Sequence, residues 1–158
     1  MEGNVFMAKY TWVKNLVPEN LEIKQVYGIV FNEKQQIFLR IDDGKYKLTG
    51  GTPETCDRCI EDTLQREFLE EVNIKLKDIH YLGYQQVDED KGKQPYAQVR
   101  MIALVDEIGE EIIDVCTGKK YGRCFVNLDK VTEKLHFDAS GNQQIDDAID
   151  LAKQKYNF

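Results

Sequence analysis

Three glutamates with helical spacing, Glu67, Glu70 and Glu71, are the residues of this chain best suited to metal-ion chemistry. At about 100° per residue, segment 58–72 forms an amphipathic helix that gathers these carboxylates on one side. Its apolar arc, which we expect to pack on a sheet, consists of Ile60, Leu64, Phe68 and Val72. Like charges at this spacing cost an isolated helix about 0.2 to 0.5 kcal/mol per pair, so a cation is expected beside them. Carboxylate oxygens favour a hard divalent ion, Mg2+ or Mn2+, which commonly also binds substrate phosphates.

The acidic charge of the chain is concentrated around this helix. The 158 residues include 28 acidic and 21 basic ones, which gives a formal net charge of -7. Segment 54–71 holds seven acidic and two basic residues, a net charge of -5. This balance argues against a protein that binds nucleic-acid polymers or membrane surfaces through basic residues. The helix charges by themselves are equally compatible with a solvated acidic face neutralised by Arg66 and nearby lysines.

The surroundings of the helix favour the metal site, because they resemble the signature of the Nudix hydrolases. That signature is a glycine-led loop followed by a helix ending in Arg-Glu-apolar-x-Glu-Glu-x-Gly-apolar. In this chain the loop is GGTPE at residues 50–54, and the helix ends in REFLEEVNI at residues 66–74. Asn73 replaces the usual glycine, and it also suits a helix C-terminus. Asp57 lies one residue further than usual from Arg66. We expect Asp57 to cap the helix, the alternative being a place among the metal ligands.

The resemblance implies hydrolysis of the pyrophosphate of a nucleoside diphosphate linked to another moiety, as in a nucleotide sugar, a dinucleotide or a modified nucleoside triphosphate. Water would attack one phosphorus, while divalent ions neutralise the oxyanions and activate the water. The expected ligands of Mg2+ or Mn2+ are Glu67, Glu70 and Glu71. By the family pattern, Arg66 would orient a glutamate, Glu67 or a neighbour, through a bidentate contact rather than touch the substrate.

The loop glycines and the general base are further parts of the expected site. Gly50 and Gly51 can adopt backbone angles closed to other residues, and they would shape the loop that faces the bound phosphates. The general base is expected to be either Glu71 or Glu89, the latter from the acidic loop 88–90. A loop with three acids is also typical of plain solvated surface.

Strand alternation adds candidates for substrate contact. In segment 96–105, Gln98 and Arg100 share one face of the expected strand, and apolar residues occupy the other. Arg100 is expected either to contact a substrate phosphate or to form a salt bridge at the sheet edge. Arg40, on a strand near the glycine loop, has the same two alternatives. Aromatic residues in strand patterns usually belong to the core, but three of them could stack on a nucleobase, namely Trp12, Tyr27 and Tyr46.

A mixed sheet with helices on its faces is expected to position these residues. The predicted strands are 25–31 and 36–41, joined as a hairpin near residue 33, followed by 46–48, 79–87, 96–105 and 123–127. The predicted helices are 58–72 and 142–156. The fold class is therefore α/β of the α+β type, and the resemblance implies a Nudix-like α/β/α sandwich with the carboxylate helix packed on the sheet. We expect residues 1–158 to form a single domain.

The remaining features bear on location and on competing functions. The N-terminus has no basic segment followed by an apolar stretch, so we expect a cytoplasmic protein without a membrane anchor. The four cysteines are expected to be ordinary thiols, because the spacing of Cys116 and Cys124 suits zinc poorly. Two alternatives compete with the hydrolase: a Nudix-fold sensor that binds a nucleotide derivative without cleaving it, and an interaction domain whose acidic helix docks a basic partner. Homodimers are common in proteins resembling this family.

Overall fold

The computed structural model describes residues 8–89 and 92–158. Expectations about residues 1–7 and about Asp90 of the acidic loop therefore lie outside the described residues. The strands are β1 (Lys9–Val13), β2 (Glu22–Phe31), β3 (Ile37–Asp42), β4 (Lys45–Lys47), β5 (Thr49–Gly51), β6 (Ile74–Asp88), β7 (Tyr96–Ile108) and β8 (Gly122–Val126). The helices are α1 (Ile60–Val72), the 3-10 turn η1 (Leu128–Lys130), α2 (Val131–Leu135) and α3 (Ala139–Tyr156). Within the described ranges, none of the helices is long and apolar enough to cross a membrane.

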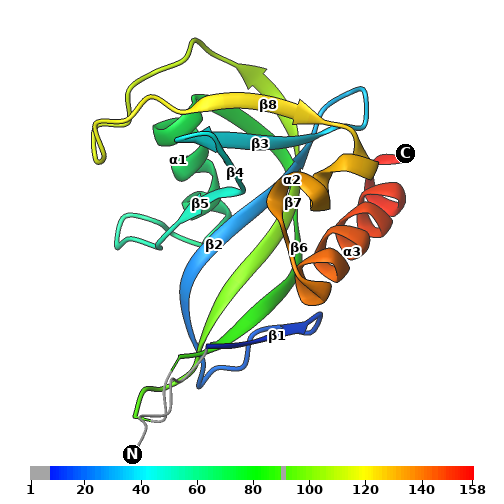
Figure 1. Cartoon of the computed structure of the whole chain (residues 1–158). Helices are drawn as coiled ribbons and strands as arrows, with labels where there is room; N and C mark the ends of the chain where they lie inside the picture. Colours follow the sequence, from blue (N-terminus) through cyan, green and yellow to red (C-terminus); the bar gives the residue numbers. More distant parts are fainter. Residues whose placement is uncertain (1–7, 90–91) are drawn as a thin grey trace, which may run out of the picture.

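The strands form one mixed sheet with a helix layer on each face (Figure 1). Its order is β1-β6-β7-β2-β3-β4, with β5 added to β2 and β8 added to β3. The β2–β7 pair is parallel, whereas β6–β7, β1–β6 and β3–β8 are antiparallel. The expected sandwich with a mixed sheet is thus confirmed. That residues 1–158 form one domain stays a prediction.

Two apolar clusters, one on each face of the sheet, hold the helices. On one face, Leu64 and Phe68 of α1 pack with Val99 and Met101 of β7. On the other face, Ile102 of β7 packs in the second cluster, whose α3 members are Ile145, Ala148 and Ala152. Because side chains alternate along a strand, β7 also directs its even-numbered residues near position 100 toward α3. The alternation predicted for this strand is confirmed.

The hairpin between β2 and β3 opens immediately after its turn. The two strands pair only at Phe31 and Ile37. Beyond that point β2 pairs with β5, and β3 pairs with β4 and β8. The predicted hairpin is confirmed, but its strands diverge instead of continuing as a ladder.

The end of α1 explains the asparagine that replaces the signature glycine. Asn73 adopts a left-handed conformation, with φ of 54°, as its predicted C-terminal role requires. Its side-chain Nδ2 donates to the carbonyl oxygen of Glu110 at 3.0 Å, and its own carbonyl accepts from Gly109 at 2.9 Å. A glycine at this position could provide only the backbone part of these contacts. Asn73 therefore joins the end of α1 to the segment that follows β7.

The expected role of the glycine pair is wrong in one respect. Gly50 and Gly51 lie in β5 and need no special backbone angle, since the described glycines with positive φ are Gly44 and Gly118. What matters instead is that these two glycines have no side chain to collide with neighbouring atoms. A Cβ on Gly50 would overlap the carbonyl oxygen of Val26, and a Cβ on Gly51 would overlap a side chain of α1. Glycine is required at these positions because other atoms approach closely.

Candidate active site

Arg66 is the hub of the polar contacts around α1. Its Nε and Nη2 donate to the two carboxylate oxygens of Asp57 at 3.0 and 2.9 Å. Its Nη1 donates to Glu67 at 2.9 Å and to Glu70 at 3.2 Å, and Nη2 also donates to the carbonyl oxygen of Thr52 at 3.0 Å. The expectation that Arg66 orients glutamates is consistent with these contacts. Its bidentate contact, however, is with Asp57 and not with a glutamate.

Asp57 is not the helix cap that the sequence suggested. Cys59 occupies the N-cap position of α1 and makes no side-chain capping bond. Asp57 lies two residues earlier, where a turn from Glu54 directs its carboxylate at Arg66. It also accepts from the hydroxyl of Thr63 at 2.8 Å and from the backbone N–H of Glu54 at 2.9 Å. These contacts, above all the Arg66 guanidinium, hold the pKa of Asp57 well below its usual range. Asp57 therefore holds the Arg66 guanidinium in place through two hydrogen bonds.

Glu71 is a largely buried carboxylate whose negative charge is poorly compensated by its surroundings. Its side chain is 12% exposed, and among the described residues its Oε2 has no hydrogen-bond donor. The nearest cation is Arg40, whose Nε lies 3.7 Å from that oxygen. Burial, reinforced by the negative charges of Glu67 and Asp114, raises the pKa of Glu71 to about 7 despite Arg40. A buried carboxylate oxygen without a donor is the kind of ligand that a divalent cation satisfies.

Glu67 lies directly against the backbone of β5. The carboxylate occupies the space that a Cβ on Gly51 would need. Burial raises the pKa of Glu67, although Arg66 opposes this shift. The signature glycine thus makes room for a carboxylate, a requirement that the spacing of residues along the chain does not reveal.

The carboxylates of α1 are suitable ligands for a hard divalent ion, but two of them accept hydrogen bonds from Arg66. Across residues 8–89 and 92–158, no three acidic, histidine or cysteine side chains are already grouped as metal ligands. The reason is visible in the contacts, because Glu67 and Glu70 both turn toward Arg66. The site offers carboxylate oxygens alone, one of them buried and without a donor among the described residues, which matches the preference of Mg2+ or Mn2+.

The second candidate for the general base lies elsewhere. Glu89 follows β6, whose 15 residues lead away from α1 to the opposite end of the sheet (Figure 1). Its carboxylate accepts from the hydroxyl of Tyr96 at 2.6 Å and pairs with Lys93 at 3.8 Å. The Glu89 carboxylate raises the pKa of Tyr96 to about 12. None of these described contacts joins Glu89 to the carboxylates of α1.

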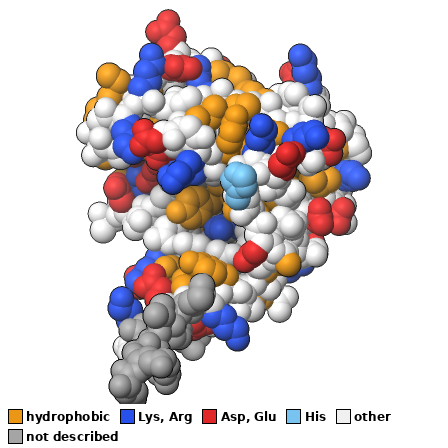
Figure 2. Space-filling model, viewed as in Figure 1, with side chains coloured by type: hydrophobic (Ala, Val, Ile, Leu, Met, Phe, Trp, Pro, Cys, Tyr) orange, Lys and Arg blue, Asp and Glu red, His pale blue; other side chains and the backbone are white. Residues whose placement is uncertain are grey.

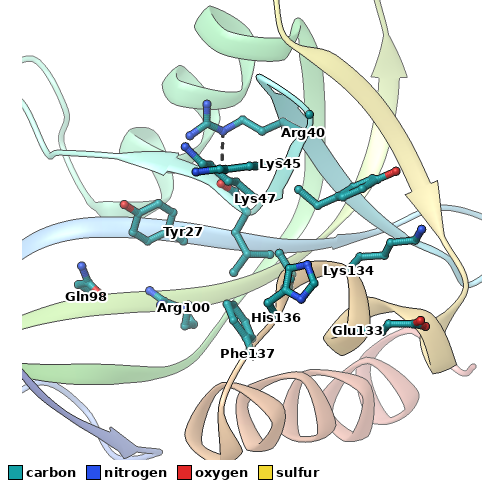
Figure 3. A pocket seen from close by; sticks show the side chains of 14 residues that line it. Tyr27, Arg40, Lys45, Lys47, Gln98, Arg100, Glu133, Lys134, His136 and Phe137 are labelled. Atoms are coloured by element: carbon teal, nitrogen blue, oxygen red, sulfur yellow. Dashed lines mark hydrogen bonds between the residues drawn. The ribbon is translucent and has the colours of Figure 1, made fainter.

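A pocket of about 870 Å³ opens on the α3 face of the sheet. Figure 2 shows Lys, Arg and His side chains around a hollow that exposes hydrophobic surface. Its basic lining residues are Arg40, Lys45, Lys47, Arg100 and Lys134, and its aromatic ones are Tyr27, Tyr46 and Phe137. Figure 3 shows that these side chains come from β2, β3, β4, β7 and the segment around α2. Sequence reasoning found Arg100, Arg40, Tyr27 and Tyr46, but missed Lys134, His136 and Phe137, which carry no motif.

Arg100 lies in this pocket and makes no ion pair with a described residue. It is 6% exposed, and its Nε donates to Gln144 of α3 at 2.9 Å. The guanidinium lies 4.9 Å from the ring centre of Tyr27, and its Nη1 is buried without an acceptor among the described groups. Burial lowers the pKa of Arg100 to about 10, so it stays charged at neutral pH. The edge salt bridge that the sequence allowed is wrong, because β7 is a central strand.

The comparisons with known proteins agree with this fold. The family model described as the NUDIX domain matches residues 23–147. A mutant of the Bacillus subtilis pyrophosphohydrolase BsRppH is 16% identical, with 90% of each chain covered and a TM-score of 0.71. A NUDIX hydrolase from Nitrosomonas europaea is 18% identical, covering 85% of this chain and 90% of that one, with a TM-score of 0.63. The NUDIX domain of Shewanella oneidensis NrtR, solved with ADP ribose, is 20% identical, covering 87% and 94%, with a TM-score of 0.62. No curated protein matches the sequence.

The sandwich fold, together with a carboxylate helix that follows paired glycines, defines the Nudix class of domains. The family model covers most of the chain, including all of α1 and the strands that flank it. This chain belongs to the Nudix family. The resemblance drawn from residues 50–54 and 66–74 is thereby confirmed.

Proposed function

We propose that this protein is a Nudix pyrophosphohydrolase that uses Mg2+ or Mn2+ and acts on a nucleoside diphosphate linked to another moiety. The observation that carries the proposal is Glu71, whose buried Oε2 has no donor among the described residues. In a chain of the Nudix family, this oxygen lies on the same helix as Glu67 and Glu70. A binding module without hydrolysis has no need of three carboxylates on one side of a helix, one of them largely buried at an energetic cost.

In this proposal, Glu67, Glu70 and Glu71 hold the metal. When bound, the ion neutralises the pyrophosphate oxygens and lowers the pKa of the attacking water. Arg66 keeps Glu67 and Glu70 on one side of α1 through its Nη1. Asp57 keeps the guanidinium in place by its bidentate contact, which a single carboxylate contact would not do as rigidly.

Glu71 is the proposed general base. A base works best when its pKa lies near the operating pH, and in the metal-free protein burial raises the pKa of Glu71 to about 7. Glu89 remains the alternative base, but its carboxylate already accepts a hydrogen bond from Tyr96.

The pocket supplies the proposed site for the rest of the substrate. Arg40 lines the pocket and also pairs with Glu71, so this one residue links the pocket to the carboxylates of α1. Aromatic and basic lining suits a nucleotide derivative, whose base stacks and whose phosphates are anionic. The NrtR domain solved with ADP ribose supports such a ligand by analogy, because its fold is similar. Cytoplasmic location and dimer formation remain proposals.

The test combines a substrate panel with matched variants. Purified protein is incubated with Mg2+ or Mn2+ and with nucleotide sugars, dinucleoside polyphosphates, NADH and oxidised nucleoside triphosphates, and products are separated by chromatography. We expect cleavage of at least one class, and loss of cleavage in Glu70→Gln combined with Glu71→Gln. Glu61→Gln, a change of the same kind in the first turn of α1, is the control and keeps activity. Cleavage by the double variant at the wild-type rate would refute the assigned chemistry.

A thermal-shift measurement separates the enzyme from the competing functions. A divalent site stabilises the folded state by mass action, by about 2.7 kcal/mol at a hundredfold excess over Kd. Stabilisation by millimolar metal with no product from any class would indicate a binding module. The absence of any response to metal would refute the metal site itself.

A further inference from the structure

The pocket on the α3 face has a charge opposite to that of the protein. The chain carries a net charge of -7, yet the pocket has five basic lining residues and one acidic lining residue, Glu133. Lys45, Lys47 and Lys134 lie exposed at its rim, whereas Arg100 is buried. A cluster of cations in an acidic protein raises the local concentration of anions. The pocket is thus suited to a ligand with a group of high negative charge.

Arg100 is the buried member of this group of basic residues, and its contacts do not include an anionic partner for its positive charge. Burying a guanidinium costs free energy unless a carboxylate or several acceptors compensate. Its partners are the Gln144 carbonyl and the face of the Tyr27 ring, and Nη1 has no acceptor among the described residues. Figure 3 shows Arg100 among the side chains that line the pocket, beneath Tyr27. The missing anionic partner of the Arg100 guanidinium is therefore expected to come from a ligand in the pocket.

A chain of four glutamines holds Arg100 in this orientation. Arg100 Nε donates to Gln144, which donates to Gln85 at 2.8 Å. Gln85 donates to Gln98 at 3.0 Å, and Gln98 donates to Gln25 at 3.1 Å. Because a guanidinium can only donate, it sets the direction of every amide in the chain. The chain thereby fixes Nε of Arg100 within the pocket lining.

The group that Arg100 would bind is separate from the pyrophosphate that is cleaved. Arg100 lies on the α3 face of the sheet, because its neighbours Val99 and Met101 pack on the α1 face. The apolar side of α1 packs on that second face, and no described contact joins Arg100 to a carboxylate of α1. We therefore take an anion bound at Arg100 to be distinct from the pyrophosphate held by the proposed metal ions.

We infer that Arg100 is a specificity-determining residue that binds a phosphate monoester on the substrate, remote from the scissile pyrophosphate. The inference rests on the proposed function in taking this ligand to be the substrate. A phosphate monoester carries a charge of about -1.5 to -2 at pH 7, which suits one buried arginine with lysines at the rim. Its oxygens can accept from the Arg100 guanidinium while Lys45 and Lys134 at the rim add positive charge.

The experiment measures binding without chemistry. Isothermal titration calorimetry is performed in EDTA with two pairs of probes that differ by one phosphate monoester: NADP+ with NAD+, and coenzyme A with dephospho-coenzyme A. We expect wild type to bind the phosphorylated member of at least one pair about tenfold more tightly, as hydrogen bonds to charged groups allow. Arg100→Gln, which keeps a donor without the charge, should lose this ratio. Arg100→Lys, which keeps the charge, should retain part of it.

Arg58→Gln is the matched control, because Arg58 is exposed, pairs with Asp62 and lies away from the pocket. It should keep the wild-type ratio. Equal affinity within both pairs in wild type, or an unchanged ratio in Arg100→Gln, would overturn the inference. The same probes are then incubated with Mg2+ or Mn2+. Selective binding without cleavage of any compound would count against the proposed hydrolase alone, and cleavage without selectivity would count against Arg100 alone.

Discussion

The Nε of Arg40 lies 3.7 Å from Oε2 of Glu71, and Arg40 also lines the pocket. Arg40 also lies over the ring of Tyr121, 4.6 Å from its centre. Arg40 is therefore the structural connection between the carboxylate helix and the pocket.

Replacing Glu71 by glutamine should stabilise the metal-free protein at pH 8. Since the pKa of Glu71 is raised to about 7 by burial, the folded state binds this proton more tightly than the unfolded state. Stability from this group is complete at low pH and is lost as pH rises toward about 7. Glu71→Gln should raise the free energy of unfolding at pH 8 by on the order of 2 kcal/mol. Urea unfolding in EDTA at pH 5 and pH 8 measures it, and an equal effect at both pH values would show that the buried charge is not the cause.

The two glycines of β5 should respond differently to alanine. Gly51→Ala displaces the flexible end of Glu67, so stability should fall by less than about 1 kcal/mol while activity falls about a hundredfold. Gly50→Ala instead meets the backbone at Val26 and Tyr27, which should cost about 3 kcal/mol of stability. Denaturation and product formation are measured side by side. Similar losses of stability in both variants would show that Glu67 does not occupy this space.

We expect Asp57 to influence catalysis by holding Arg66 in position. Asp57→Asn keeps the shape but loses one of the two charge-assisted acceptors, so we expect kcat to fall about tenfold with little change in KM. Because the folded-state pKa of Asp57 is depressed, its contribution to stability is present above its unfolded pKa and is lost as pH falls further. The variant should therefore lose less stability on acidification than wild type. Asp62→Asn, whose partner is the exposed Arg58, is the control and should leave kcat unchanged.

Arg100 should lower the stability of the free protein. Arg100→Gln removes a buried charge that lacks an anionic partner among the described residues and keeps a donor for Gln144, so the free energy of unfolding should rise by about 1 kcal/mol. Arg58→Gln should change it by less than about 0.5 kcal/mol. Chemical denaturation without ligand compares the two variants. A large loss of stability in Arg100→Gln would mean that the arginine serves packing.

Local patterns of the sequence determined much of this protein. Apolar spacing at 3.6 residues was enough to place α1 and to gather Glu67, Glu70 and Glu71 on one side of it. Strand alternation placed Arg100 and Gln98 on the face away from the apolar residues. These features repeat within a few residues, so neighbouring positions in the chain suffice to define them.

The tertiary structure alone decided which partners these residues meet. Asp57 looked like a helix cap, but the fold of the preceding turn directed it to Arg66. Arg100 meets Gln144, 44 positions away, and the glutamine chain joins residues up to 73 positions apart. Contacts at such separations depend on how the strands are ordered and which face each helix covers, and no local period encodes that choice. The sequence therefore identified the carboxylates and their family, whereas the arrangement of β2, β3, β4, β7 and the segment around α2 built the pocket.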